Sequence, residues 1–255
     1  APFGDALFGL GGSDRLNGSS GWDGLFGGNG DDRLFGNGGD DWLNGGSGND
    51  VINGGTGIDT VDYSDAAGGI TLNLSSTRGQ RTGGSGTDTV TNVENGSGSS
   101  FHDRLTGNGL VNQLDGNGGN DQLFGRGGND ILTGGLGDDL IDGGIGIDMA
   151  NYAEAVAGVA VNLSLAGAQD TVGSGIDTLV SIENIDGSGF NDVLTGNAGA
   201  NTLNGGEGAD QLVGGDGNDV LIGGAGTDIY NGGAGNDILI AGPEAGYGDM
   251  EFAPD

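Results

Sequence analysis

The sequence predicts an all-β fold, a flattened solenoid in which short strands alternate with loops and two parallel sheets face each other. Three observations support this prediction. Gly accounts for 64 of the 255 residues, an acidic residue followed two positions later by an aliphatic one recurs every nine residues, and a longer period of 89 residues repeats the whole pattern. Such a composition would indicate disorder if it had no period, whereas a fixed period indicates stacked structural repeats.

Composition and charge exclude several classes of protein. The chain has 37 acidic and 6 basic residues, a net charge of −31 and no Cys. A nucleic-acid or anionic-membrane binder needs a basic surface, so we expect neither partner and expect a cation instead. Disulfides and thiolate metal sites are impossible, and no apolar run is long enough to span a membrane. Only 33% of the residues are hydrophobic, too few for an ordinary globular enzyme of this length.

The nine-residue unit is clearest in GGSGNDVIN, residues 45–53. Its Gly residues suit a loop with positive φ, and the aliphatic residue at the eighth position points inward from a very short strand. Two units per turn would stack each sixth-position side chain on the one 18 residues later. The sixth position is occupied by Asp5, Asp14, Asp23, Asp32, Asp41, Asp50, Asp59, Asp103, Asn112, Asp121, Asp130, Asp139, Asp148, Asp192, Asn201, Asp210, Asp219, Asp228 and Asp237.

Stacked carboxylates repel one another unless a cation lies between them. Carboxylates and loop carbonyls are hard oxygen ligands, and a site that offers six or more of them suits Ca²⁺ better than Mg²⁺. The sequence therefore predicts calcium sites along the loops.

The 89-residue period divides the chain into nearly three modules. We predict arrays at residues 1–62, 103–151 and 192–240, inter-array β segments at residues 63–102 and 152–191, and a cap or tail at residues 241–255. Within the inter-array segments, ITLNLS (70–75) and VAVNLS (159–164) alternate apolar and polar residues, which predicts half-buried strands. GGSGTDTVT (83–91) and VGSGIDTLV (172–180) follow the nonapeptide plan, so these segments are interpreted as distorted continuations of the solenoid.

The units GGSGNDVIN, GGLGDDLID (134–142) and GGDGNDVLI (214–222) resemble the RTX calcium-binding nonapeptide, GGxGxDxUx, over nearly the whole chain. The resemblance implies a right-handed parallel β-roll that folds around Ca²⁺ outside the cell after type I secretion. It also implies that each ion lies between one sixth-position Asp and the Asp 18 residues later, with loop carbonyls completing the shell. Roughly 13 ions would follow from that rule, and the pairs that contain Asn112 or Asn201 should bind more weakly.

The same resemblance assigns loop ligation to glycines at the second and fourth positions. These are Gly28, Gly30, Gly46, Gly48, Gly135, Gly137, Gly215, Gly217, Gly224 and Gly226.

Several other residues invite a functional interpretation. Acidic residues directly before the ligand position are better explained by turn geometry, because Asn takes the same place elsewhere. The only histidine, His102, is expected to be a solvated loop residue, so no His-based catalytic triad or zinc cluster is predicted. A structural role is favoured over an extra metal ligand for Glu94 and Glu183. Ordinary cover of a thin sheet is favoured over a sugar-stacking platform for Trp22 and Trp42.

No catalytic site and no organic cofactor are predicted, because the acids repeat along a line and no segment breaks the pattern to form a cleft. The favoured function is a secreted, non-catalytic calcium-binding module that is disordered without Ca²⁺ and rigid with it. An adhesin or surface-layer module with a glycan or cell-surface partner is the second hypothesis. An accessory substrate-binding module of a larger RTX enzyme, such as an epimerase or protease, is the third.

Overall fold

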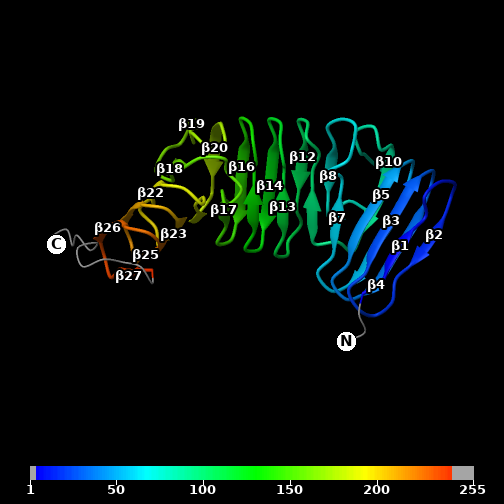
Figure 1. Cartoon of the computed structure of the whole chain (residues 1–255), viewed down its shortest axis with the longest axis horizontal. Helices are drawn as coiled ribbons and strands as arrows, with labels where there is room; N and C mark the ends of the chain where they lie inside the picture. Colours follow the sequence, from blue (N-terminus) through cyan, green and yellow to red (C-terminus); the bar gives the residue numbers. More distant parts are fainter. Residues whose placement is uncertain (1–3, 243–255) are drawn as a thin grey trace. The chain divides into compact units, whose positions relative to one another are not determined.

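A computed structural model describes residues 4–242 of the chain. The last predicted segment, residues 241–255, therefore lies almost wholly outside the described residues. Residues 4–242 contain 27 strands and no helix, which confirms the all-β prediction, and hence no helix that could cross a membrane. The chain forms two compact units, Ala1–Gly128 (unit 1) and Asn129–Asp255 (unit 2), each built as a parallel β-solenoid (Figure 1).

In unit 1, alternate strands go to opposite sides of the solenoid. One side is a parallel sheet in the order β1 (Ala6–Phe8), β3 (Gly24–Asn29), β5 (Trp42–Ser47), β7 (Thr60–Asp62), β11 (Asn95–Ser97) and β13 (Gln113–Asp115). The other side begins with β2 (Arg15–Asn17), β4 (Arg33–Gly38), β6 (Val51–Thr56), β10 (Thr87–Thr91) and the antiparallel β9 (Gln80–Arg81). It restarts as a second sheet with β8 (Thr71–Asn73), β12 (Arg104–Thr106) and β14 (Gln122–Gly127).

Unit 2 repeats this plan. One sheet has the order β15 (Ile131–Thr133), β17 (Met149–Asn151), β21 (Asn184–Asp186), β23 (Thr202–Glu207), β25 (Val220–Ala225) and β27 (Ile238–Ile240). The opposite side consists of β16 (Leu140–Ile145), β20 (Ile176–Val180) and the antiparallel β19 (Gln169–Asp170), followed by β18 (Ala160–Asn162), β22 (Val193–Thr195), β24 (Gln211–Asp216) and β26 (Ile229–Ala234).

The core is a ladder of eighth-position aliphatic side chains. Leu16 pairs with Leu34, Leu34 with Ile52, and Ile52 with Val90. All but Leu16 are fully buried, and burying one such side chain contributes roughly 1.5–3 kcal/mol. Since each short strand places only one residue inside, the core is thin, and the loops must supply part of the stability.

Strands of the inter-array segments pair with strands of the arrays, in agreement with their interpretation as continuations of the solenoid. ITLNLS and VAVNLS form β8 and β18, and GGSGTDTVT returns to the array as β10, in parallel register with β6. The antiparallel strands β9 and β19 were not predicted. Each is held by a Gln, since Gln80 and Gln169 accept backbone N–H bonds from Asn73 and Asn162.

Candidate metal centre

The sixth-position carboxylates lie at the corners of each solenoid unit, directly before the strands. Most are buried. Asp32, Asp50 and Asp219 expose no more than 1% of their surface. Asp5 is exposed, while Asp14 and Asp237 are half-buried. Burying a carboxylate is costly unless hydrogen bonds or opposite charge compensate for the lost water.

A ladder of hydrogen bonds joins corners 18 residues apart. The backbone N–H of Asp14 donates to Oδ1 of Asp32 at 2.8 Å, and the N–H of Asp32 donates to Oδ1 of Asp50 at 2.8 Å. The sequence prediction paired the same residues, and within the two units the structure joins them. The other pairs joined in this way are 5/23, 23/41, 41/59, 103/121, 130/148, 192/210, 201/219, 210/228 and 219/237.

At many corners the second carboxylate oxygen is buried and has no hydrogen-bond partner within residues 4–242. We call these corners open. Their loops carry a second-position residue with positive φ, such as Gly28 at 101° and Gly46 at 82°. Asp14, Asp32, Asp41, Asp50, Asp59, Asp148, Asp210 and Asp219 are the residues whose Oδ2 is left in this state.

The unbonded oxygen of an open corner faces a main-chain carbonyl across the first glycine of its loop. A Cβ built on Gly27 would lie 2.5 Å from Oδ2 of Asp32 and 2.5 Å from the carbonyl oxygen of Gly45. Two hard oxygen atoms therefore converge where glycine leaves room. A cation in this space would compensate the buried negative charge.

All ten glycines predicted as loop ligands adopt positive φ, between 82° at Gly46 and 146° at Gly48. A Cβ at Gly46 would collide with the carbonyl of Gly28, one turn earlier. Glycine is therefore required both for the backbone conformation and for the close stacking of successive loops. This confirms the predicted loop conformation, while ligation by these residues stays a prediction.

Three predicted ligands lie at corners of another kind, which we call closed: Asp23, Asp103 and Asp192. Here Ser replaces the second-position glycine and its backbone N–H bonds the carboxylate. Oδ2 of Asp23 accepts the N–H of Ser19 at 2.6 Å and its hydroxyl at 3.1 Å, while Oδ1 accepts the N–H of Asp5 at 2.7 Å. The backbone N–H groups of Ser99 and Ser188 likewise donate to Oδ2 of Asp103 and Asp192, while the hydroxyls of these serines donate to Oδ1. These carboxylates are satisfied by the protein itself.

The carbonyl of a closed corner can be satisfied as well. Nδ2 of Asn37 donates to the carbonyl of Gly18 at 2.9 Å, and Nδ2 of Asn117 donates to that of Gly98 at 2.8 Å. Asn37 and Asn117 occupy second positions of the next loops and adopt φ of 74° and 66°. These bonds tie each closed loop to the loop stacked on it, whereas the carbonyl that faces Oδ2 of Asp23 across Gly18 is that of Gly36.

Asn112 and Asn201 fit their corners for a different reason than the sequence prediction assumed. Each donates Nδ2, at 2.7 Å, to the backbone carbonyl 18 residues earlier, of Glu94 and Glu183. The N–H of Glu94, which would otherwise bond a carboxylate, already donates to the carbonyl of Asp59. An Asp at either position would set oxygen against oxygen, so an amide is needed where the array restarts.

Four corner residues were not predicted by the spacing of 18 residues. Asp88 and Asp177 accept the N–H of residues 38 positions earlier, Asp50 and Asp139, because the inter-array loops lengthen the turn. Glu94 and Glu183 accept the N–H of Asp59 and Asp148 in the same way. Asp88 and Asp177 occupy the sixth position of units that the sequence already identified, which was the available signal. The two Glu residues recur with the 89-residue period, but the nine-residue period does not mark them as corner residues.

A second ladder runs beside the first, through the residue before each corner carboxylate. Oδ1 of Asp31 accepts the N–H of Asn49, and Oδ1 of Asp40 accepts the N–H of Ile58, both at 2.8 Å. This agrees with a role in turn geometry. His102 is exposed, as expected, but it also belongs to this ladder, since its Nδ1 accepts the N–H of Asn120.

The pKa shifts distinguish several open corners from Asp23. Burial, with neighbouring carboxylates adding to it, raises the pKa of Asp50 to about 7 and that of Asp41 and Asp210 to about 6. Burial acts on Asp23 too, but the hydrogen bonds from Ser19 and Asp5 outweigh it and lower the pKa of that carboxyl. At Asp103, another closed corner, burial outweighs the hydrogen bonds from Ile70 and Ser99 and raises the pKa, so hydrogen bonds stabilise the charge at Asp23 more fully than at Asp103.

The donor set fits Ca²⁺. Among residues 4–242 no three His, Cys, Asp or Glu side chains cluster as a metal site, so a corner offers carboxylates together with main-chain carbonyls. Oxygen ligands in a flexible loop suit Ca²⁺, which accepts six to eight of them, better than Zn²⁺. Asp32, Asp50 and the loop carbonyls between them are one set that would hold such an ion.

Fold and corners together define a parallel β-solenoid with hard-cation sites along its loops. A family model for the RTX calcium-binding nonapeptide repeat (4 copies) matches residues 2–34, 26–61, 97–132, 115–150, 181–212 and 204–239, well over half of the chain. The chain therefore belongs to the RTX calcium-binding repeat family, and it is a calcium-binding repeat module. No curated protein matched the chain. Two internal stretches without a family match, 62–96 and 151–180, fall in the predicted inter-array segments 63–102 and 152–191 except for their first residues.

Proposed function

We propose that this chain is a secreted, non-catalytic module that is largely unfolded without Ca²⁺ and folds when ions fill its open corners. The observation that carries the proposal is the row of buried Oδ2 atoms without partners at the open corners. An uncompensated buried carboxylate costs several kcal/mol, and the row repeats this cost at successive turns.

Other contributions to the folding free energy also disfavour the fold without Ca²⁺. A chain with 64 Gly loses much conformational entropy on folding, and a net charge of −31 makes the compact state repel itself. One aliphatic side chain per short strand buries little apolar surface against these costs. Ion binding then supplies the missing free energy, so that binding and folding are one event.

The proposal also includes that the module acts outside the cell and is exported by type I secretion. Membership in the RTX family and the need for abundant Ca²⁺ support both parts. A chain that is unfolded at the low Ca²⁺ of the cytosol would be ready for export and would fold outside.

The experiment is a far-UV circular dichroism titration of the full chain, from excess chelator to millimolar Ca²⁺, with Mg²⁺ as the matched control. We expect a disordered spectrum in chelator, a cooperative change to β structure with Ca²⁺, and little change with Mg²⁺. A β spectrum that is identical in chelator and in Ca²⁺ would refute the proposal.

A further inference from the structure

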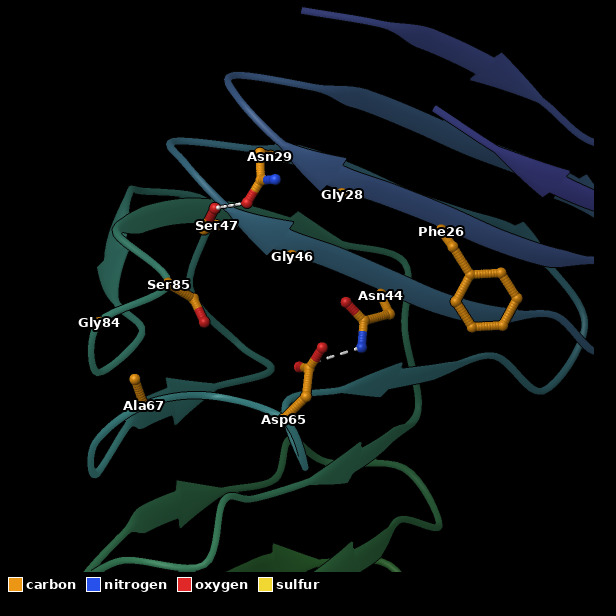
Figure 2. Close-up of a pocket in the computed structure, with 10 residues that line it drawn as sticks. All are labelled: Phe26, Gly28, Asn29, Asn44, Gly46, Ser47, Asp65, Ala67, Gly84 and Ser85. Atoms are coloured by element: carbon orange, nitrogen blue, oxygen red, sulfur yellow. Dashed lines mark hydrogen bonds between the residues drawn. The ribbon is translucent and has the colours of Figure 1, made fainter. Parts of the chain in front are cut away.

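Unit 1 contains a hollow of about 360 Å³ that the calcium chemistry does not explain (Figure 2). Its floor is formed by β3 and β5, where Gly28 and Gly46 leave the backbone bare. Loops of the inter-array segment, with Ala67 and Ser85, form the opposite wall. The volume lies at the lower end of the range for small-molecule sites.

Two residues that line the hollow are mostly buried, and each has a side-chain oxygen without a hydrogen-bond partner among the described residues. Ser85 is 5% exposed and Asn44 is 8% exposed. Asn44 donates Nδ2 to Asp62 and Asp65, which fixes the side chain and leaves its Oδ1 free. Figure 2 shows that the Ser85 hydroxyl and the Asn44 amide oxygen both point into the hollow. A hydroxyl and an acceptor held in place in this way are suited to a ligand that carries hydroxyl groups.

An aromatic wall completes the site. The ring of Phe26 borders the hollow, next to Asn44 along the sheet. Phe8 stacks on Phe26 with 5.0 Å between the ring centroids and fixes the ring from the other side. A fixed apolar ring beside convergent acceptors is the combination that binds a sugar, whose C–H groups pack on the ring while its hydroxyls bond the polar groups.

The negative charge around the hollow limits which sugars can bind there. The exposed carboxylate of Asp65 lies in the lining of the hollow, and the whole chain carries −31. Both would repel a uronic or sulfated sugar, so the ligand chemistry is that of an uncharged pyranose.

The hollow is particular to the first module. Adding 89 to the positions of Ser47 and Ala67 leads to Leu136 and Val156 in unit 2, which are 50% and 66% exposed. Position 115, the counterpart of Phe26, is Asp. The second module thus has larger apolar side chains where the first has small ones, and it lacks the ring. This difference provides a matched control.

We propose that the hollow bordered by Phe26, Asn44 and Ser85 binds an uncharged pyranose unit of a glycan. This binding goes beyond the calcium-dependent folding proposed above, although the hollow exists only once the fold has formed.

The test uses the full chain in saturating Ca²⁺, first on an array of neutral and anionic glycans and then by calorimetric titration of the neutral glycans that bind. Ala67→Leu fills the hollow and Phe26→Ala removes the ring, and both positions lie outside the calcium corners. We expect each variant to bind at least tenfold more weakly than the wild type. Val156→Leu, the corresponding change in the second module, should bind as the wild type does.

Circular dichroism in Ca²⁺ on the same samples separates loss of the fold from loss of the site, because the proposal concerns only variants with the wild-type spectrum. Ala67→Leu, at an exposed position, is the variant expected to keep that spectrum. The proposal is overturned if the wild type binds no neutral glycan, if it binds only anionic glycans or a divalent cation at this place, or if a folded Ala67→Leu variant binds as tightly as the wild type.

Discussion

Replacing one carboxylate at an open corner should affect calcium affinity, whereas the same replacement at a closed corner should affect stability alone. Asp32→Asn and Asp23→Asn are matched in size and shape. Asp32 has one oxygen bonded to the N–H of Asp14 and one buried without a partner, while both oxygens of Asp23 are bonded by N–H donors.

The magnitudes follow from these contacts. Removing one partner of a buried charge pair costs about 3–5 kcal/mol, so the ions beside Asp32 should bind at least a hundredfold more weakly. Asp32 is bonded both to Asp14 and to Asp50, so two ions should be affected. At Asp23 the new NH₂ group faces an N–H donor, which costs about 1–3 kcal/mol of folding free energy with no specific effect on ion binding.

The assay is calorimetric titration with Ca²⁺, together with urea unfolding in excess Ca²⁺. Asp32→Asn should lose high-affinity ions and shift the calcium midpoint of folding upward. Asp23→Asn should keep the ion count of the wild type and unfold at lower urea. Equal loss of ions in both variants would refute the distinction between open and closed corners.

Three further predictions concern protons, glycine and the restart of the array. Because burial raises the pKa of Asp50 to about 7, the empty fold binds protons that the unfolded chain releases, so it gains stability as pH falls from about 7 towards 4. Protonation of the empty fold then replaces part of the stabilisation that Ca²⁺ must otherwise supply, so the calcium midpoint of folding measured by circular dichroism should be lower at pH 5.5 than at pH 8; a higher midpoint at pH 5.5 would contradict this. Gly46→Ala should destabilise the calcium-loaded protein by at least about 1–2 kcal/mol in urea unfolding, because the φ of Gly46 is 82° and a Cβ there would meet the carbonyl of Gly28. The control is Gly109→Ala, which should be neutral because a Cβ at Gly109 meets nothing within 4 Å. Asn112→Asp should lower stability without adding a calcium ion, because it loses the hydrogen bond to the carbonyl of Glu94; an added ion in the titration would show that the amide is a weakened ligand instead.

Much of the fold could be predicted from the sequence because one period governs it. The aliphatic residue at every ninth position predicted the Leu16 to Val90 ladder, and the spacing of 18 predicted which corners would stack. Glycine at alternate loop positions predicted positive φ, which Gly28 and Gly46 adopt. Each of these features depends on one residue and its copy one turn away, so a period is sufficient to find it.

The closed corners could not be predicted, because a single Ser in place of Gly resembles a minor variation of the repeat. Its effect is conformational. Without positive φ, the N–H of Ser19 turns towards Asp23 and occupies the oxygen that a cation would need. Local backbone geometry therefore decides which corners hold unsatisfied charge, even though open and closed corners alike carry an Asp.

The stacking partners across the inter-array segments could not be predicted either, for a different reason. Their loops change the spacing from 18 to 38 and 35 residues, so the partner of Asp50 is Asp88 and that of Asp59 is Glu94. A spacing of this kind depends on the path of a long loop in space. Asn112 shows the same limit, since its amide is explained only by the carbonyl that faces it.

The central claim is that cations at the open corners hold the solenoid together, and crystallography of the full chain grown in Ca²⁺, with anomalous data collected to locate the ions, tests it most directly. We predict ions beside the free Oδ2 atoms of Asp14, Asp32 and Asp50, and none bound to Oδ2 of Asp23, which keeps its bonds to Ser19. Empty open corners in a folded protein, or an ion bound to that oxygen of Asp23, would contradict the claim.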